Sequence, residues 1–361
     1  LVKDIRIQNS LIGMYVKCGS LKEARDVFDE MPFHDVISWT TLITGLADND
    51  PGNAAIQMFK KMRLTHISPN AVTLSGLLKS CSTVGDIDTG QEIHREIVEN
   101  SYEKDELVSG SLVCMYAKCG SLEEARDIFD NLRVHDVVTW TTLIVAYTEH
   151  GRGEEALQCM EKMKLEGFMP DAVTLVCTLK ACISIGSFKT GQELHVYALK
   201  VGLEKNAYVA NCLIEMYGNH SSYIEAKYVF AKLPCRDVVS WNSLISGYAE
   251  HGFHEEVLEC FEQMQLENVP PNAGTYIYFL KSCGSIGALE HGQRIHANIV
   301  QNQLEEDLFI GNNLVDMYGK FQLLIEALEV FEELLIRDVF SWNALIGAYV
   351  DNGFLEEALL S

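Results

Sequence analysis

The strongest constraint on the fold of this chain is an internal repeat with a constant period of 101 residues. Met-Tyr pairs recur in one register at 14–15, 115–116, 216–217 and 317–318, and no insertion interrupts the series. Such self-similarity is the signature of a repeat architecture, in which each unit buries its apolar face only against its neighbours. Tryptophan returns at the same interval: Trp39, Trp140, Trp241 and Trp342.

Each period divides into three related repeat units, of 35, 35 and 31 residues. We expect one continuous array over residues 1–361, and a piece of a longer one, because the chain starts inside one unit and stops inside another. The expected units are 5–35, 36–70, 71–105, 106–136, 137–171, 172–206, 207–237, 238–272, 273–307, 308–338 and a partial unit at 339–361.

The apolar spacing within each unit predicts two helices. In the unit 106–136 the first helix is expected to end at Gly120, because glycine accepts the left-handed backbone conformation. Ser121 and Glu124 then have the spacing of a capping box at the start of the second helix. The predicted fold is all-α, a right-handed superhelical solenoid of helix-turn-helix repeats, that is, an α-α superhelix. The same serine recurs at Ser20 and Ser222.

The charge and the cysteine content bear on whether the chain binds nucleic acid, a metal ion or a cofactor. The net charge of −23 is opposite to the positive surplus with which most nucleic-acid-binding proteins release counterions from phosphates. Eleven cysteines without a CxxC pair indicate reduced, mostly buried thiols, and we expect no metal and no cofactor. No apolar run of about 18 uncharged residues occurs, so no membrane partner is expected.

The residues of the units resemble one family. The tryptophan units open Val-Val-Thr-Trp-Thr at 137–141, the middle units carry Gly-Gln-Glu-Leu-His at 191–195, and the short units carry Met-Tyr-Ala-Lys-Cys-Gly at 115–120. With the 35-35-31 rotation, these are similar to the P, L and S motifs of plant pentatricopeptide repeat proteins of the P-L-S class. Tetratricopeptide arrays, which bind proteins, keep a single period near ~34 residues. The units follow the order S, P, L from 5–35 onward, and 339–361 is a partial P unit.

The resemblance implies that each unit reads one base of single-stranded RNA with its fifth and last residues. Gly110, Val176 and Ile277 stand at fifth positions without a polar side chain, so their units are expected to be silent. The implied RNA is approximately 5′-UANNGNUYNUY-3′. The implied base-reading residues are Asn9 with Asp35 for U, Thr40 with Asn70 for A, Ser75 with Asp105 leaning to G, Thr141 with Asp171 for G, Asn211 with Asp237 for U, Asn242 with Asn272 for C or U, Asn312 with Asp338 for U, and Asn343 without its partner.

Two further sets of RNA contacts follow from the resemblance. The second residue of a unit is expected to flank the base, and the thirteenth residue of an S unit to contact phosphate. The P units depart from a phosphate-binding pattern, because they carry an acid at the thirteenth position. The flanking residues are Ile37, Val72, Val138, Val173 and Val239. The phosphate-binding lysines are Lys17, Lys118 and Lys320, with Asn219 in the remaining copy.

The resemblance implies the address module of an organellar C-to-U RNA editing factor, in a plant mitochondrion or chloroplast. Such factors carry their chemistry in a zinc deaminase domain with HxE and CxxC motifs. Residues 1–361 contain no CxxC, so this segment is not expected to be an enzyme. The L units are expected to engage small editing cofactor proteins. Two alternatives stay open: a protein-binding helical scaffold for those cofactors, which the negative charge favours, and an RNA stabilisation or splicing factor without deamination.

Structural explanations compete with several of these roles. His94, His195 and His296 lie three hairpins apart, roughly 30 Å at about 10 Å per helix layer, which is too far for one metal ion. The tryptophans lie one helical step from the fifth residues, so we expect them in the core rather than stacked on bases. The last Asp or Asn of each unit is also a common helix cap.

Overall fold

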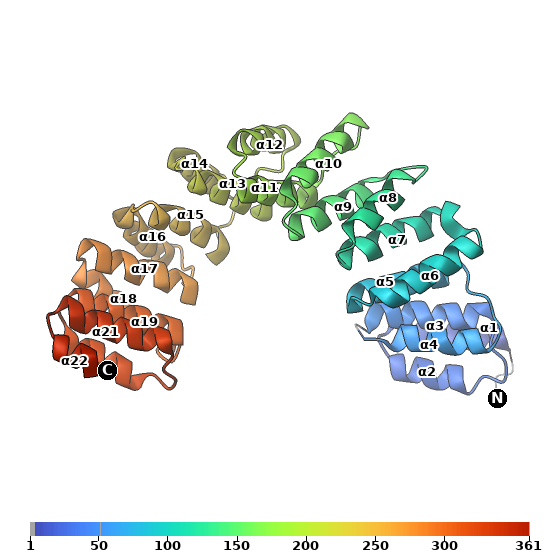
Figure 1. Cartoon of the computed structure of the whole chain (residues 1–361), viewed down its shortest axis with the longest axis horizontal. Helices are drawn as coiled ribbons and strands as arrows, with labels where there is room; N and C mark the ends of the chain where they lie inside the picture. The colour runs from blue at the N-terminus through green and yellow to red at the C-terminus, as the bar shows by residue number, and fades with distance from the viewer. Residues whose placement is uncertain (1–3, 51, 361) are drawn as a thin grey trace. The chain divides into compact units, whose positions relative to one another are not determined.

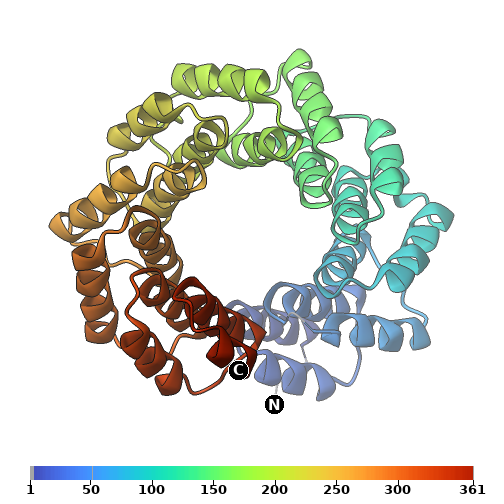
Figure 2. The ribbon, with the colours of Figure 1, turned by 60° about the vertical axis from the view of Figure 1, so that its left-hand side comes forward.

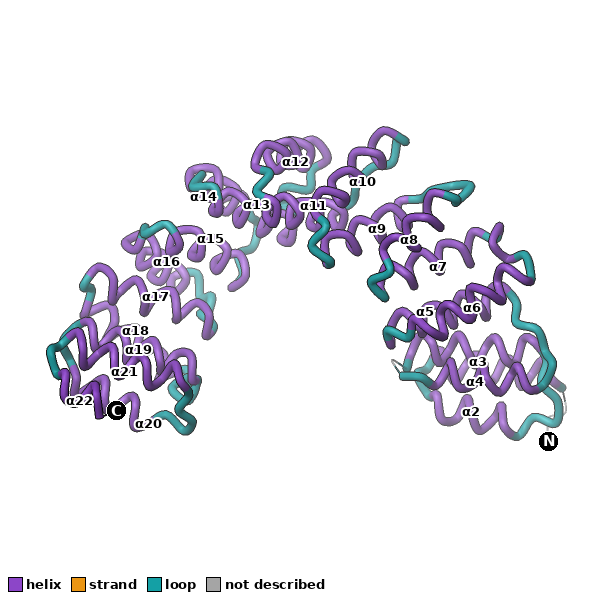
Figure 3. Tube along the Cα trace, in the orientation of Figure 1, coloured by secondary structure: helices purple, strands orange, loops and turns teal. Residues whose placement is uncertain are grey.

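The computed structural model describes residues 4–50 and 52–360, and within these residues it contains helices and loops but no strand (Figure 3). The chain divides into two compact halves, Leu1–Ile185 and Gly186–Ser361, each described by itself below. None of the described helices is long and apolar enough to cross a lipid bilayer.

The N-terminal half pairs the helices of each expected unit in chain order. The first helices are α1 (Ile5–Lys17), α3 (Val36–Asn49), α5 (Ala71–Val84), α7 (Glu106–Lys118), α9 (Val137–Glu149) and α11 (Ala172–Ile185). The second helices are α2 (Leu21–Asp29), α4 (Ala54–Leu64), α6 (Ile87–Glu99), α8 (Leu122–Asp130) and α10 (Gly153–Leu165), and a short 3₁₀ turn, η1 (Tyr102–Lys104), precedes α7.

The C-terminal half repeats the pattern. Its second helices are α12 (Phe188–Val201), α14 (Tyr223–Lys232), α16 (His254–Leu266), α18 (Leu289–Gln301), α20 (Leu324–Glu333) and α22 (Leu355–Leu360). Its first helices are α13 (Ala207–Asn219), α15 (Val238–Glu250), α17 (Ala273–Ile286), α19 (Leu308–Lys320) and α21 (Val339–Asp351).

Each half has two layers (Figures 1 and 2). First helices of consecutive units pack on one another, as α3 does on α1 and α5, and α15 on α13 and α17. A second helix packs on the first helices of its own unit and of the next, as α10 does on α9 and α11. The first helices therefore form one continuous layer in each half, which we call the first-helix layer, and this confirms the predicted class of an α-α solenoid.

Side chains at the unit boundaries begin the first helices of the P units. Asp136 Oδ1 accepts hydrogen bonds from the backbone N–H of Thr139 at 2.7 Å, and Thr139 Oγ1 accepts from the backbone N–H of Asp136 at 3.1 Å. This reciprocal capping box satisfies two backbone donors that a helix start leaves open. The same box opens α3, α15 and α21 in the other P units, and also α17 in the unit 273–307.

The expected capping boxes of the S units are wrong. The side chains of Ser20, Ser121 and Ser222 make no capping hydrogen bond to their helices. The reason lies in the preceding turn, where Gly120 has a φ of 81° and the Ser121 N–H donates to the Tyr116 carbonyl at 3.0 Å. That N–H is the group a capping box would need, and the end of the first helix already uses it.

Three of the four tryptophans lie in the core, as predicted, and Trp342 does not. Trp39, Trp140 and Trp241 are at most 3% exposed, and the Trp140 ring meets Phe129 of α8 edge-on at 4.5 Å between centroids. Such edge-to-face contacts add to the stabilisation that burial gives. Trp342 is 39% exposed.

A hydrogen bond repeated within the S units ties the chain after the second helix back to that helix. His34 Nε2 lies 2.9 Å from the Phe28 carbonyl oxygen, and Arg337 Nε donates to the Phe331 carbonyl at 2.9 Å. His135 at the matching position does the same at 3.2 Å. The hydrogen bond satisfies a carbonyl near the end of the second helix and fixes the chain just before the last residue of the unit.

Candidate nucleic-acid interface

The structure brings several expected base-reading pairs into hydrogen-bond contact. In the first S unit Asn9 Nδ2 donates to Asp35 Oδ1 at 3.2 Å. In the last S unit Asn312 Nδ2 donates to Asp338 Oδ1 at 3.4 Å. The fifth residue is on the first helix of its unit and the last residue caps the first helix of the next unit, so the contact ties two consecutive first helices together.

In the P units a buried threonine links the two residues of the pair. Thr174 Oγ1 donates to Asp171 Oδ1 at 2.8 Å and lies 2.8 Å from Thr141 Oγ1. The other two links are Thr73 between Thr40 (2.7 Å) and Asn70 (3.0 Å), and Thr275 between Asn242 (2.7 Å) and Asn272 (2.9 Å). Asn242 Nδ2 also donates directly to Asn272 Oδ1 at 3.2 Å.

The repeat pattern alone did not indicate a role for these threonines. They stand at the third position of each L unit, recur at 101-residue intervals and are fully buried. A hydroxyl three residues after an Asp or Asn was recognisable as a capping partner, but nothing in one unit's sequence indicated that it also reaches the preceding unit.

Other expected pairs are not joined in this way. The Ser75 hydroxyl pairs with Ser111 at 2.7 Å, while Asp105 Oδ1 accepts from the backbone N–H of Leu107 at 3.0 Å. Asn343, in the partial unit, is exposed. Gly110, Val176 and Ile277 contribute no polar side chain at their fifth positions.

The last residues of the units also cap helices, as the competing structural explanation held. The hydrogen bonds from the Ser240 hydroxyl and backbone N–H lower the pKa of Asp237, although burial opposes them. Burial raises the pKa of Asp35, but the hydrogen bonds from Ser38 and Asn9 outweigh it, so the pKa lies below its ordinary value. These carboxylates are therefore ionised at neutral pH and act only as acceptors.

The fifth-position asparagines of three S units each hold an acceptor that nothing in the structure satisfies. Asn211 and Asn312 are each 9% exposed, and Asn9 is partly buried. The Oδ1 atoms of all three are buried and have no hydrogen-bond partner. A buried polar atom without a partner is rare in folded proteins and needs an explanation. The Nε1 atoms of Trp39, Trp140 and Trp241 are also buried without a partner, but they belong to the core, whereas the asparagine oxygens lie at the fifth positions.

A cavity of about 340 Å³ in the first-helix layer collects the predicted elements of one base site. Its walls include the flanking residues Val138 and Val173, which are 70% and 53% exposed. Thr141 and Asp171 supply polar groups, and Lys118 is among the lining residues. An apolar cavity with a few polar groups is the arrangement that binds a flat heteroaromatic ring.

The C-terminal half holds a second, more acidic cavity of about 720 Å³ at the matching position. Val239 and Asn242 line it, and Asn219 occupies the place of the phosphate-binding lysine. Glu250 also lines it, as Glu149 lines the first cavity. The remaining flanking residues, Ile37 and Val72, are 56% and 48% exposed.

The three predicted phosphate-binding lysines differ in surroundings. All are exposed on the first-helix layer, but Lys320 forms an ion pair with Asp316 at 2.7 Å. Lys118 forms no ion pair within the described residues and lies beside Glu149 at the cavity. Lys17 and Lys118, which form no ion pair within the described residues, are therefore better placed than Lys320 to attract an anion.

The three recurrent histidines have a structural partner. His94, on α6, lies with Nδ1 2.9 Å from the hydroxyl oxygen of Tyr116 on α7. The same pairing joins His195 to Tyr217 at 2.8 Å and His296 to Tyr318 at 2.8 Å. The part of the chain that the structure describes has no group of three or more His, Cys, Asp or Glu that could hold a metal ion.

Comparison with known proteins identifies the repeats. The PPR repeat family matches residues 34–83, 135–184 and 236–285, and the PPR repeat matches 9–36, 109–137, 312–339 and 340–360. The chain belongs to the pentatricopeptide repeat family. A chloroplastic pentatricopeptide repeat-containing protein of Arabidopsis thaliana is 36% identical over 99% of this chain and 58% of its own length. A mitochondrial one is 33% identical over 97% of this chain and 51% of its own length, so the chain spans about half the length of the relatives it matches.

A solved pentatricopeptide repeat structure has the same fold. The protein PPR10, in complex with an 18-nucleotide psaJ RNA element, aligns over 98% of this chain and 59% of its own length, with a TM-score of 0.65. The maize PPR10 crystal structure aligns over 98% of this chain and 64% of its own, with a TM-score of 0.53. At 18% and 16% identity, these two neighbours of the pentatricopeptide repeat chain support its fold alone.

Proposed function

We propose that this pentatricopeptide repeat protein binds single-stranded RNA sequence-specifically, one base per unit, through its first-helix layer. The observation that carries the proposal is the row of unsatisfied, buried Oδ1 acceptors on Asn9, Asn211 and Asn312. Uracil has an N–H on its pairing edge and so supplies the missing donor. In the first and last S units an aspartate holds the amide N–H₂, which keeps Oδ1 pointing away as an acceptor.

The cavity in the P unit 137–171 supports the same function. Two valines from successive first helices form the walls of the cavity, and Thr141 and Asp171 supply polar groups. A base between the valines would lose water from both faces, and its edge would meet one hydroxyl and one carboxylate. The solved relative that shares the fold carries RNA in its complex.

The unit boundaries, and the P, L and S types, belong to this proposal. Helices α3, α5, α7, α9 and α11 begin at the first residues of successive expected units, from Val36 to Ala172. In that register the RNA is approximately 5′-UANNGNUYNUY-3′, and the array serves as the address module of an organellar C-to-U editing factor. Relatives with chloroplast or mitochondrial names support the organelle.

The test replaces the hydrogen-bond acceptor Asp171 in the unit 137–171. Asp171→Asn replaces a carboxylate, which only accepts, by an amide that also donates, while its Oδ1 can still cap α11. We expect the preferred fifth base to change from G toward A, by about fivefold in affinity. Binding is measured by fluorescence anisotropy with two RNAs that differ only at that base.

The control is Glu161→Gln, which removes one exposed charge from the second helix α10, outside the first-helix layer. It should leave the G-to-A ratio unchanged. If neither wild type nor Asp171→Asn distinguishes the two RNAs, base reading is rejected. The protein-binding scaffold then becomes the better hypothesis.

A further inference from the structure

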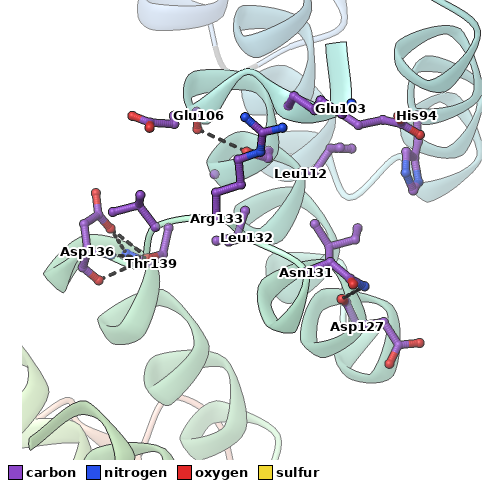
Figure 4. A pocket seen from close by; sticks show the side chains of 15 residues that line it. His94, Glu103, Glu106, Leu112, Asp127, Asn131, Leu132, Arg133, Asp136 and Thr139 are labelled. Atoms are coloured by element: carbon purple, nitrogen blue, oxygen red, sulfur yellow. Dashed lines mark hydrogen bonds between the residues drawn. The ribbon is translucent and has the colours of Figure 1, made fainter. Parts of the chain in front are cut away.

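The S unit 106–136 departs from the other S units at two positions that lie in one cavity. Its fifth residue is Gly110, where the others have an asparagine. Its twenty-eighth residue is Arg133, where the others have Pro32, Pro234 and Leu335. Both residues line a cavity of about 500 Å³ between α6, α7, α8 and the start of α9 (Figure 4).

The space at Gly110 is open rather than filled by a neighbour. A Cβ atom built there would have its nearest contact with Thr139 Cγ2 at 3.7 Å, an ordinary van der Waals distance. Gly110 is within α7, and no positive φ requires a glycine there. The missing side chain therefore enlarges the cavity without being required by the backbone.

The polar groups of the cavity are complementary to one base. Asp136 Oδ1 accepts two hydrogen bonds from Thr139, but no asparagine donates to this carboxylate, unlike Asp35 and Asp338. Arg133 is exposed and forms no ion pair within the described residues. The carboxylate offers acceptors, and the guanidinium offers donors in a fixed fork.

Guanine presents the matching pattern. Its pairing edge has two adjacent N–H donors for a carboxylate, and its O6 and N7 are the acceptors that arginine binds with two hydrogen bonds. Adenine, cytosine and uracil each lack either the two adjacent N–H donors or the pair of adjacent acceptors. Leu112, Leu132 and Val134 supply apolar wall, and Lys104 also lines the cavity, together with Glu103, Glu106 and Asp127.

We infer that the unit 106–136 is not silent, and that its Gly110 cavity selects guanine at the fourth base through Asp136 and Arg133. This inference rests on the proposed RNA-binding function. It replaces the fourth position of the expected RNA, so that the sequence begins 5′-UANG.

The experiment uses four RNAs that differ only at the fourth base and two that differ at the fifth. Wild type should prefer G at the fourth base on the order of tenfold. Arg133→Ala should reduce binding of the G4 RNA to that of the other three and leave those unchanged. Arg95→Ala, which removes an exposed arginine from α6 away from this cavity, is the matched control and should change nothing.

A second variant tests the cavity by filling the space at Gly110. Gly110→Asn restores the side chain of the other S units, which should donate to Asp136, fill the space and change the preferred fourth base from G to U. Equal weakening of all four RNAs by Arg133→Ala, or wild type without preference at the fourth base, overturns the inference. If wild type still distinguishes the two fifth-base RNAs, only this inference fails and the proposed RNA-binding function stands. If wild type does not distinguish them either, the proposed function is rejected.

Discussion

A buried polar atom without a partner costs about 1–3 kcal/mol. In this chain the cost recurs at one position of the 101-residue repeat, on Asn9, Asn211 and Asn312, and the remaining copy has Gly110. A leucine or alanine at these positions would avoid it, and asparagine is a poor helix former. A ligand that donates a hydrogen bond recovers the cost, so the free protein is less stable than it would otherwise be and binding is correspondingly favoured.

The threonine bridge of the P units gives a prediction at the same scale. Thr174→Val keeps the shape of the buried side chain but removes the hydroxyl that joins Thr141 to Asp171. We expect the selectivity at the fifth base to fall about fivefold, because both reading groups lose the contact that orients them. Competition binding with the two fifth-base RNAs measures the effect.

Thr178→Val is its matched control. Thr178 is equally buried on α11, and its hydroxyl bonds only to backbone carbonyls of its own helix. Both variants should lose about 1 kcal/mol of unfolding free energy. Equal loss of selectivity in the two would show that destabilisation, and not the bridge, is responsible.

At the scale of elements, one histidine–tyrosine hydrogen bond recurs between the second helix of an L unit and the first helix of the next S unit. Burial lowers the pKa of His94, His195 and His296 from 6.5, and nearby carboxylates, such as Glu103 for His94, oppose it only in part. Burial also raises the pKa of Tyr116, Tyr217 and Tyr318. Both partners are therefore neutral in the folded protein at pH 7.

A pH dependence of stability follows. Below about pH 6.5 the unfolded chain binds protons at these histidines more strongly than the folded chain does. The free energy of unfolding should therefore fall as the pH drops through 6.5, until the pH passes the lowered folded values. Thermal unfolding between pH 7.5 and pH 5 measures this change.

The variant that tests the assignment changes His94, His195 and His296 together to Gln, which keeps a hydrogen-bonding group but cannot titrate. Its midpoint temperature should vary less with pH over this interval than that of wild type. His291→Gln, at a more exposed position on α18, is the control and should retain the wild-type slope. A triple variant with an undiminished slope would place the titration elsewhere.

At the scale of the whole molecule, the net charge of −23 disfavours binding of the negatively charged RNA backbone. The first-helix layer also carries acidic residues beside its lysines. Lys118 and Glu149 line one cavity, and Lys320 is neutralised by Asp316. Counterion release requires cations that remain free to meet phosphate. We therefore expect Lys118 to contribute more to RNA affinity than Lys320.

The corresponding prediction compares three single variants across a salt series. Lys118→Ala should weaken binding of all RNAs about equally and reduce the magnitude of the salt slope by about one. Lys320→Ala should have a smaller effect, and Glu149→Gln should strengthen binding. An unchanged slope in Lys118→Ala would remove this lysine from the interface.

The sequence determined the class of fold, because a constant period leaves each unit only its neighbours on which to bury its apolar residues. The tryptophan core, the glycine-terminated first helices and the capping role of the last residues all follow from local pattern. Local pattern failed at Ser121, where the N–H that a capping box needs was already bonded to Tyr116.

Tertiary structure decided how groups from different units meet. The link from Thr141 through Thr174 to Asp171 and the histidine–tyrosine pairs both cross unit boundaries, so no single unit's pattern contains them. The cavity beside Gly110 depends in the same way on what the neighbouring helices leave open. Spacing along the chain fixes which residues face the same layer, but packing between layers fixes which atoms come within hydrogen-bond distance.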